Sequence, residues 1–88
     1  MKEVTKWDDI SFIISSSYRH KVLKGLNEPK TPSKLSKELG INKTHISRAL
    51  SELESKNMIK CLTPEVKKGR IYVATDYGRE VLEKFSKM

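Results

Sequence analysis

The amino-acid sequence predicts a mainly α domain that carries a helix-turn-helix followed by a two- or three-stranded β-hairpin, or wing. Two helical patterns joined by a glycine predict the helix-turn-helix over residues 31–57. Two short β-patterned segments around a polar turn predict the wing over residues 58–74. Apolar helical patterns over 1–15 and 75–88 complete what we expect to be one domain of 88 residues.

Basic residues are concentrated in the middle of the chain. The sequence has 18 Lys and Arg against 11 Asp and Glu, a formal net charge of +7. Residues 16–60 hold ten basic and four acidic side chains, whereas residues 75–88 hold three of each. This excess favours a polyanionic partner, although acidic proteins and membrane surfaces attract it as well.

Several classes of protein are disfavoured by the sequence. Cys61 is the only cysteine, so no intramolecular disulfide or thiolate zinc cluster can form. No apolar run approaches the roughly 18 residues of a membrane span, and the start does not resemble a signal peptide. No nucleophile motif surrounds the serines, histidines or aspartates. We therefore expect a cytoplasmic protein that is not an enzyme and needs no metal, cofactor or membrane.

The first helix is expected over residues 7–15, with Asp8 or Asp9 as its cap. Trp7 precedes an apolar stripe, and Phe12 lies off that stripe, which consists of Ile10, Ile13 and Ile14. A helix that is apolar on two sides indicates either a subunit contact or packing of Phe12 on another element of the same chain. A β-strand over the isoleucine-rich run is an alternative.

A second helix is expected from Tyr18 to Leu26, after the serines at 15–17, which can cap it. We expect four residues of this helix to point inward: Tyr18, Val22, Leu23 and Leu26. Residues 27–29 end the helix, and residues 30–31 form a candidate short strand.

The helix-turn-helix begins at Thr31, a favourable N-cap, with Pro32 at the first helical position. Gly40 suits the left-handed position at the end of this helix. Leu35 and Leu39 form the apolar face of this first helix, and Asn42 caps the second helix of the motif.

The second helix of the motif, expected over residues 43–56, has two different faces. One face is apolar and comprises Ile46, Ala49, Leu50 and Leu53. The other face is polar and basic and comprises Thr44, Ser47, Arg48, Ser51 and Ser55, with Lys43 and His45 at the entrance. Such a helix can be held on a core by one face and offer the other to a duplex groove. The alternative is an ordinary solvated face.

The wing is expected over residues 58–74, with strands at 58–62 and 71–74. Asn57 suits the left-handed cap before it, and Pro64 and Gly69 mark turns. The tip is basic because three cations surround the second turn: Lys67, Lys68 and Arg70.

The last helix is expected from a cap at Thr75 to about Lys87, and Gly78 in its first turn permits close approach of a neighbour. Its apolar stripe is wide for one small core to cover fully, which predicts a homodimer contact. The residues expected in that contact are Trp7, Phe12, Tyr77, Val81, Leu82, Phe85 and Met88. The alternative is that the helix folds back onto the 18–26 helix and covers its own stripe.

The order of elements resembles that of winged helix-turn-helix transcription regulators of the ArsR and MarR type, especially small archaeal members. The resemblance extends from about Ser17 to Leu82 and rests on several fragments, among them TPSKL at 31–35, HISRAL at 45–50 and GRIY at 69–72. It implies that Lys43, Thr44, Ser47, Arg48 and Ser51 lie in the major groove or on its phosphates. It implies that Lys67, Lys68 and Arg70 lie in a wing beside the minor groove.

The chain departs from metal-sensing members of that class, which carry a cysteine pair or a carboxylate and histidine cluster. We also expect Ser33 and His45 at the DNA; a pH switch at His45 is the less favoured alternative to a plain polar contact. The alternative for Arg48 is an ion pair with Glu52, four residues on. Cys61 is expected in a buried strand, with redox sensing as the less favoured alternative.

The sequence therefore predicts a sequence-specific regulator that binds double-stranded DNA as a homodimer on a two-fold site. The alternative is a winged helix that acts as a protein-interaction module within a larger transcription or chromatin assembly. RNA binding is disfavoured because the sequence offers no expected pair of exposed aromatic side chains for base stacking.

Overall fold

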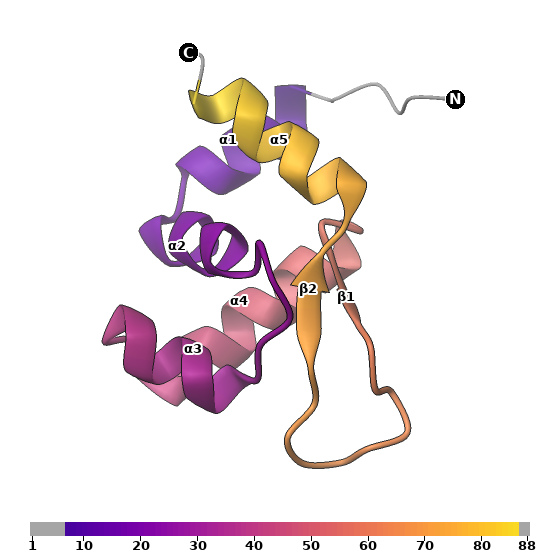
Figure 1. The fold of residues 1–88 in the computed structure, drawn as a ribbon. Coiled ribbons are helices and arrows are strands. Elements are labelled where there is room, and N and C mark those ends of the chain that lie inside the picture. Colours follow the sequence, from indigo (N-terminus) through magenta and orange to yellow (C-terminus); the bar gives the residue numbers. More distant parts are fainter. Residues whose placement is uncertain (1–6, 87–88) are drawn as a thin grey trace.

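The computed structural model describes residues 7–86 and confirms the predicted fold class, five helices with a small antiparallel hairpin (Figure 1). Residues 1–6 of the expected first segment, and Met88 of the expected dimer contact, lie outside the described residues. The elements are α1 (Trp7–Ile14), α2 (Ser17–Gly25), α3 (Pro32–Leu39), α4 (Lys43–Ser55), β1 (Ile59–Cys61), β2 (Tyr72–Ala74) and α5 (Asp76–Ser86).

The helix boundaries follow from the capping residues. The Thr31 hydroxyl accepts a hydrogen bond from the Lys34 amide at 3.2 Å, and the Asn42 side-chain oxygen accepts one from Thr44 at 2.9 Å. These side chains satisfy amide groups that have no partner inside their helices. Gly40 ends α3 in the left-handed region with φ 65°. The predicted turn between α3 and α4 is therefore confirmed.

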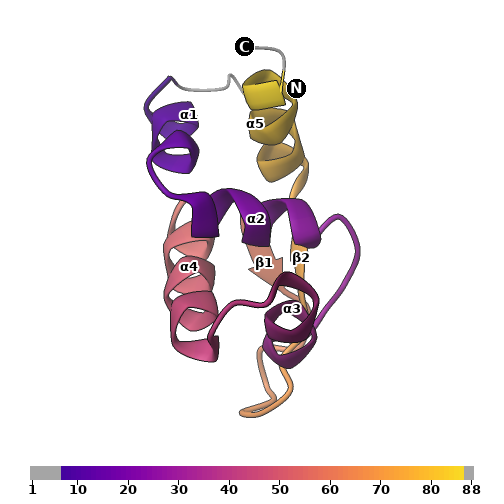
Figure 2. The same ribbon diagram turned by 90° about the vertical axis from the view of Figure 1, so that its left-hand side faces the viewer.

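The core lies between α4 and the helices that cross it. Figure 2 shows α2 running across α4, with α1 and α5 above α2 and the wing at the opposite end of the molecule. The inward side of α4 is buried, as predicted, and α2 packs against it through buried aliphatic side chains. The largest fully buried side chains are Ile13, Leu23, Leu26, Leu35, Ile46, Leu53, Met58 and Ile59, with Val22 and Val81.

The wing is held to the helices at its base. β1 and β2 pair antiparallel, with Ile59 opposite Ala74 and Cys61 opposite Tyr72. A single β-bridge joins Lys30 to Tyr72, so the expected strand at 30–31 is reduced to one residue. The Thr75 amide donates to the Met58 carbonyl at 2.9 Å, which ties the start of α5 to the start of the wing.

Two expectations about inward-facing residues are wrong. Ile14 is 49% exposed, because α1 is rotated so that Asp9 faces the interior, where the Tyr77 hydroxyl donates a hydrogen bond to it. Tyr18 is 39% exposed and stacks on His45 instead of entering the core. Phe12 is half-buried and packs on its own chain, which is the second of the two alternatives for this residue.

The apolar stripe of α5 is covered mainly by the chain itself. Val81 is fully buried, and α5 packs against both α1 and α2. The Phe85 ring lies 4.6 Å from the His20 ring of α2, centroid to centroid. Tyr77 and Leu82 are half-buried against the same core. The chain itself therefore covers this stripe in part, with α1 and α2 supplying the covering surface, and the homodimer contact stays a prediction.

Candidate nucleic-acid interface

The outward face of α4 is polar, basic and fully accessible. Its inward residues are locked into the core, and this fixes which side chains face solvent. All six residues predicted to contact DNA from this helix are exposed, namely Lys43, Thr44, His45, Ser47, Arg48 and Ser51. Glu54 and Ser55, near the end of the helix, are exposed as well. Because Ile46 and Leu50 fill the opposite side, the helix presents hydrogen-bonding groups without a large apolar side chain among them.

Arg48 has no ion-pair partner within residues 7–86, and the alternative pairing with Glu52 is not the one observed. Glu52 instead accepts two hydrogen bonds from Arg19, each 3.1 Å long. The hydrogen bond from Arg19 lowers the pKa of Glu52, partial burial opposes this, and the charges of Arg19 and Arg48 lower it further. Arg48 therefore lies close enough to Glu52 to influence it without binding it.

Tyr18 is a candidate site residue that the sequence analysis did not identify. Its ring stacks on the His45 ring, with centroids 4.7 Å apart and planes at 19°. Together with Ser16 and Arg48 these residues line a shallow hollow at the edge of α4. The pair is an exposed stack of rings that the sequence analysis did not expect. No pattern in the sequence marks Tyr18 as exposed, since helical periodicity predicts that it points inward from α2.

The wing tip carries the other expected cations. Lys67, Lys68 and Arg70 are all exposed, and Gly69 between them adopts φ 69°. The Arg70 guanidinium donates to the Val66 carbonyl at 2.6 Å, so this side chain also closes the turn. Within the described part of the chain, the two lysines have no such partner and are free to meet an anionic surface.

The predicted contact residues lie on α3, α4 and the wing, three elements that meet at one end of the molecule. The wing tip and the end of α4 next to α3 point the same way in both ribbon views, away from α1 and α5 (Figures 1 and 2). Ser33 is exposed in the first turn of α3, which lies at this end. The three elements therefore form one candidate contact surface, which we call the α4–wing surface.

The residues expected in a dimer contact differ in their exposure to solvent. Trp7 is 63% exposed, whereas Val81 is completely buried. Phe12 is covered by the Arg19 guanidinium, which lies 3.9 Å from the centroid of its ring. Val81 is therefore removed from any exposed surface, and Trp7 and Ile14 are the large apolar side chains of α1 that remain accessible.

Among the described residues we find neither a cluster of metal ligands nor a membrane-spanning helix. Within residues 7–86, no group of three or more His, Cys, Asp and Glu side chains is placed to hold a metal ion. None of the helices described is both long enough and apolar enough to cross a membrane. Cys61 is half-buried in β1 and has a free thiol.

The fold and the exposed cationic surface define a winged helix-turn-helix protein. The family model described as the HVO_A0261 N-terminal domain matches residues 7–88, and the chain belongs to this family. No curated protein sequence matches it.

Three solved structures illustrate the similarity. The first is a variant of MarR from E. coli complexed with operator DNA, at 25% identity and a TM-score of 0.74, over 91% of this chain and 59% of that one. TubR from Bacillus thuringiensis, bound to 24 bp of tubC, has 14% identity and a TM-score of 0.79, over 99% and 98% of the two chains. A MarR family transcription regulator has 24% identity and a TM-score of 0.73 over 82% of this chain. The chain spans about half the length of that regulator, 50%.

Proposed function

We propose that this protein is a transcriptional regulator that binds specific sequences in double-stranded DNA, of the kind seen in small archaeal ArsR- and MarR-like proteins. The observation that carries the proposal is the α4–wing surface. It joins a helix face of Thr, Ser and Arg side chains to a loop of unpaired lysines, with no exposed large apolar residue on α4. Side chains of these types recognise base edges and phosphates.

In this proposal α4 enters the major groove, and residues 63–70 of the wing contact the backbone or the minor groove. Arg48 is the principal specificity residue, because a free guanidinium can form two hydrogen bonds with guanine. Thr44, Ser47 and Ser51 supply shorter contacts beside it, and Ser33, Lys43 and His45 meet the flanking phosphates. The operator DNA in the MarR variant structure and the tubC DNA in the TubR structure support this reading of the fold.

Selection of binding sites from random duplex DNA at two salt concentrations tests the proposal. The wild-type chain should enrich a defined motif at both concentrations, because base contacts persist when phosphate contacts weaken. Arg48→Ala should lose preference at one position of the motif. Lys84→Ala is the control, because it removes one positive charge from α5, far from the α4–wing surface, and should keep the motif unchanged. Absence of any enriched motif would contradict the proposal.

We also propose that two copies pair on a two-fold DNA site. The contact would use the exposed face of α1 that carries Trp7 and Ile14, seven residues apart and therefore on one side of the helix. Helix α1 lies at the end of the molecule away from the wing (Figure 1). Sedimentation of the chain at micromolar concentration should show twice the 10.1 kDa monomer mass, and Trp7→Ala should shift it towards the monomer. A 10.1 kDa species throughout would exclude the pair.

The same exposed apolar face favours a second candidate function, a protein-interaction module within a transcription or chromatin assembly. Trp7 and Ile14 are among the few large apolar side chains exposed within residues 7–86. In that case the duplex selection would enrich nothing, and Trp7→Ala would abolish binding of the partner while Arg48→Ala would not.

A further inference from the structure

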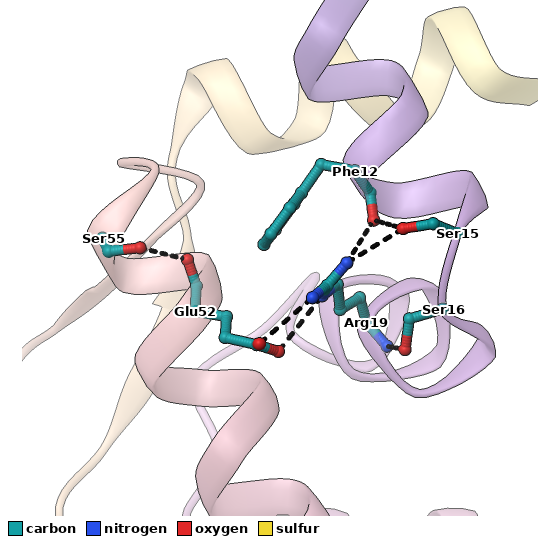
Figure 3. Close-up of polar contacts among 6 residues, drawn as sticks. All are labelled: Phe12, Ser15, Ser16, Arg19, Glu52 and Ser55. Carbon is teal, nitrogen blue, oxygen red and sulfur yellow. Dashed lines mark hydrogen bonds and ion pairs between the residues drawn. The ribbon is translucent and has the colours of Figure 1, made fainter.

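The side chain of Arg19 is the most densely bonded group beside the α4–wing surface. Figure 3 shows it reaching from α2 to both oxygens of Glu52 on α4 and to the end of α1. Its Nη1 donates to the Phe12 carbonyl at 3.0 Å and to the Ser15 hydroxyl at 2.9 Å. Arg19 therefore joins three helices through one guanidinium group.

In this contact each of the two carboxylate oxygens of Glu52 accepts one hydrogen bond from Arg19. Nε of Arg19 lies 3.1 Å from Oε1 of Glu52, and Nη2 lies 3.1 Å from Oε2. A two-point contact of this kind is specific to the planar fork of arginine and restricts the carboxylate in position and orientation. The ring of Phe12, 3.9 Å beneath the guanidinium, limits its movement further.

Arg48 competes for the same carboxylate in principle. It precedes Glu52 by four residues on α4, a spacing at which helix side chains of opposite charge form ion pairs. Its charge already lowers the pKa of Glu52, after the larger effect of the Arg19 hydrogen bond. Within the described residues no ion pair between Arg48 and Glu52 forms, and both oxygens of the Glu52 carboxylate accept hydrogen bonds from Arg19.

We propose that Arg19 is a positioning residue for DNA recognition, because it holds Glu52 and thereby keeps Arg48 free to reach the DNA. It also neutralises the one carboxylate on the flank of α4 that faces α2. This inference rests on the proposed function. It differs from a simple role in folding, since the effect of Arg19 on DNA binding passes through Glu52 and Arg48.

A set of substitutions at Arg19 and Glu52 tests the inference. Arg19→Met keeps an unbranched apolar side chain over Phe12 but releases Glu52 to pair with Arg48. It should weaken binding to the selected duplex by about two- to fivefold relative to Lys21→Met, which removes the same charge from an exposed position of α2. The double variant Arg19→Met/Glu52→Gln has the wild-type net charge and should bind within about 1.5-fold of wild type.

Two further variants separate this mechanism from loss of structure. Glu52→Gln alone should bind at least as tightly as wild type, whereas a clamp that merely orients α4 would make it bind more weakly. In an Arg48→Ala background, Arg19→Met should weaken DNA binding no more than Lys21→Met does. The released Glu52 then has no Arg48 side chain with which to pair. Circular dichroism melting of each variant establishes that the folded proteins are being compared.

The inference is overturned if the double variant binds as weakly as Arg19→Met, or if Glu52→Gln alone weakens binding. It is also overturned if Arg19→Met and Lys21→Met have equal effects. Failure of the proposed function gives a different pattern, in which wild type shows no duplex preference or Arg48→Ala binds like wild type. Should Arg19→Met fail to fold, the result with Glu52→Gln still decides between the two roles.

Discussion

Replacement of Gly78 by alanine should destabilise the protein although it adds a better helix former to α5. Gly78 is buried in the first turn of α5, and a Cβ atom built there lies 2.0 Å from the carbonyl oxygen of Met58. That distance is far inside van der Waals contact, and the obstructing atom is backbone that cannot rotate away. The same oxygen accepts the Thr75 amide hydrogen bond at 2.9 Å. A shift of α5 therefore strains the junction between the wing and the last helix.

The size of the effect follows from three contributions. Overpacking costs about 1–3 kcal/mol, and weakening of the Thr75 hydrogen bond adds about 1 kcal/mol. The higher helix propensity of alanine opposes these costs and stabilises α5 by about 1 kcal/mol relative to glycine. The free energy of unfolding of Gly78→Ala should therefore fall by about 1–3 kcal/mol, and Tm should fall by about 4–8 °C for each kcal/mol in a domain of this size.

Urea denaturation and thermal melting measure this loss, with Gly25→Ala as the matched control. A Cβ atom at Gly25 meets the ends of two side chains and no backbone atom, Leu35 Cδ2 at 3.0 Å and Leu39 Cδ1 at 3.9 Å. Gly25→Ala should therefore stay within about 1 kcal/mol of wild type, because the small steric cost and the gain in helix propensity oppose each other. Equal stability of Gly78→Ala and Gly25→Ala would show that the approach of α5 to Met58 is not as close as described.

Three further predictions concern the surface and an ion pair. Arg48→Ala should weaken binding to a selected duplex by about 1–3 kcal/mol in a fluorescence titration, and leave Tm unchanged. Replacing Lys67 and Lys68 by alanine should lower the slope of log affinity against log salt by about 0.9 per lost phosphate contact; an unchanged slope would identify a merely solvated turn. The hydrogen bond from buried Lys30 lowers the pKa of Glu38 below the ordinary 4.5. The ionised Glu38 therefore stabilises the fold fully above pH 4.5, and this stabilisation is lost as the pH falls through the lowered pKa. Glu38→Gln should remove this part of the acid dependence in melts between pH 6 and about pH 3, and an unchanged pH dependence would contradict the assignment.

Local chemistry made much of the fold predictable. The caps at Thr31, Asn42 and Thr75, and the left-handed residues at Gly40 and Asn57, depend on side chains and backbone preferences within a few residues of each helix end. Because such signals are local, sequence patterns reveal them. The polar face of α4 was predictable for the same reason, since its helical period separates it from the buried face.

The wrong predictions concern residues whose burial or pairing depends on contacts between elements that are distant in the sequence. Asp9 faces the interior because Tyr77, far along the chain, donates a hydrogen bond to it, and this rotation exposes Ile14. Glu52 pairs with Arg19, 33 residues away, and not with the nearby Arg48. Helical periodicity identifies residues that share a face but not which neighbouring helix will cover that face.

The central claim is that α4 reads base sequence and does not only attract phosphate. It is tested most directly by the ratio of affinities for the selected duplex and for a scrambled duplex of the same length, measured by fluorescence anisotropy at physiological salt. Specific DNA-binding proteins reach ratios of about 10³ or more, because base contacts add to the shared electrostatic contribution. We predict a ratio in that range for wild type and a large reduction for Arg48→Ala. A wild-type ratio near one would contradict the claim and reduce the α4–wing surface to a general polyanion contact.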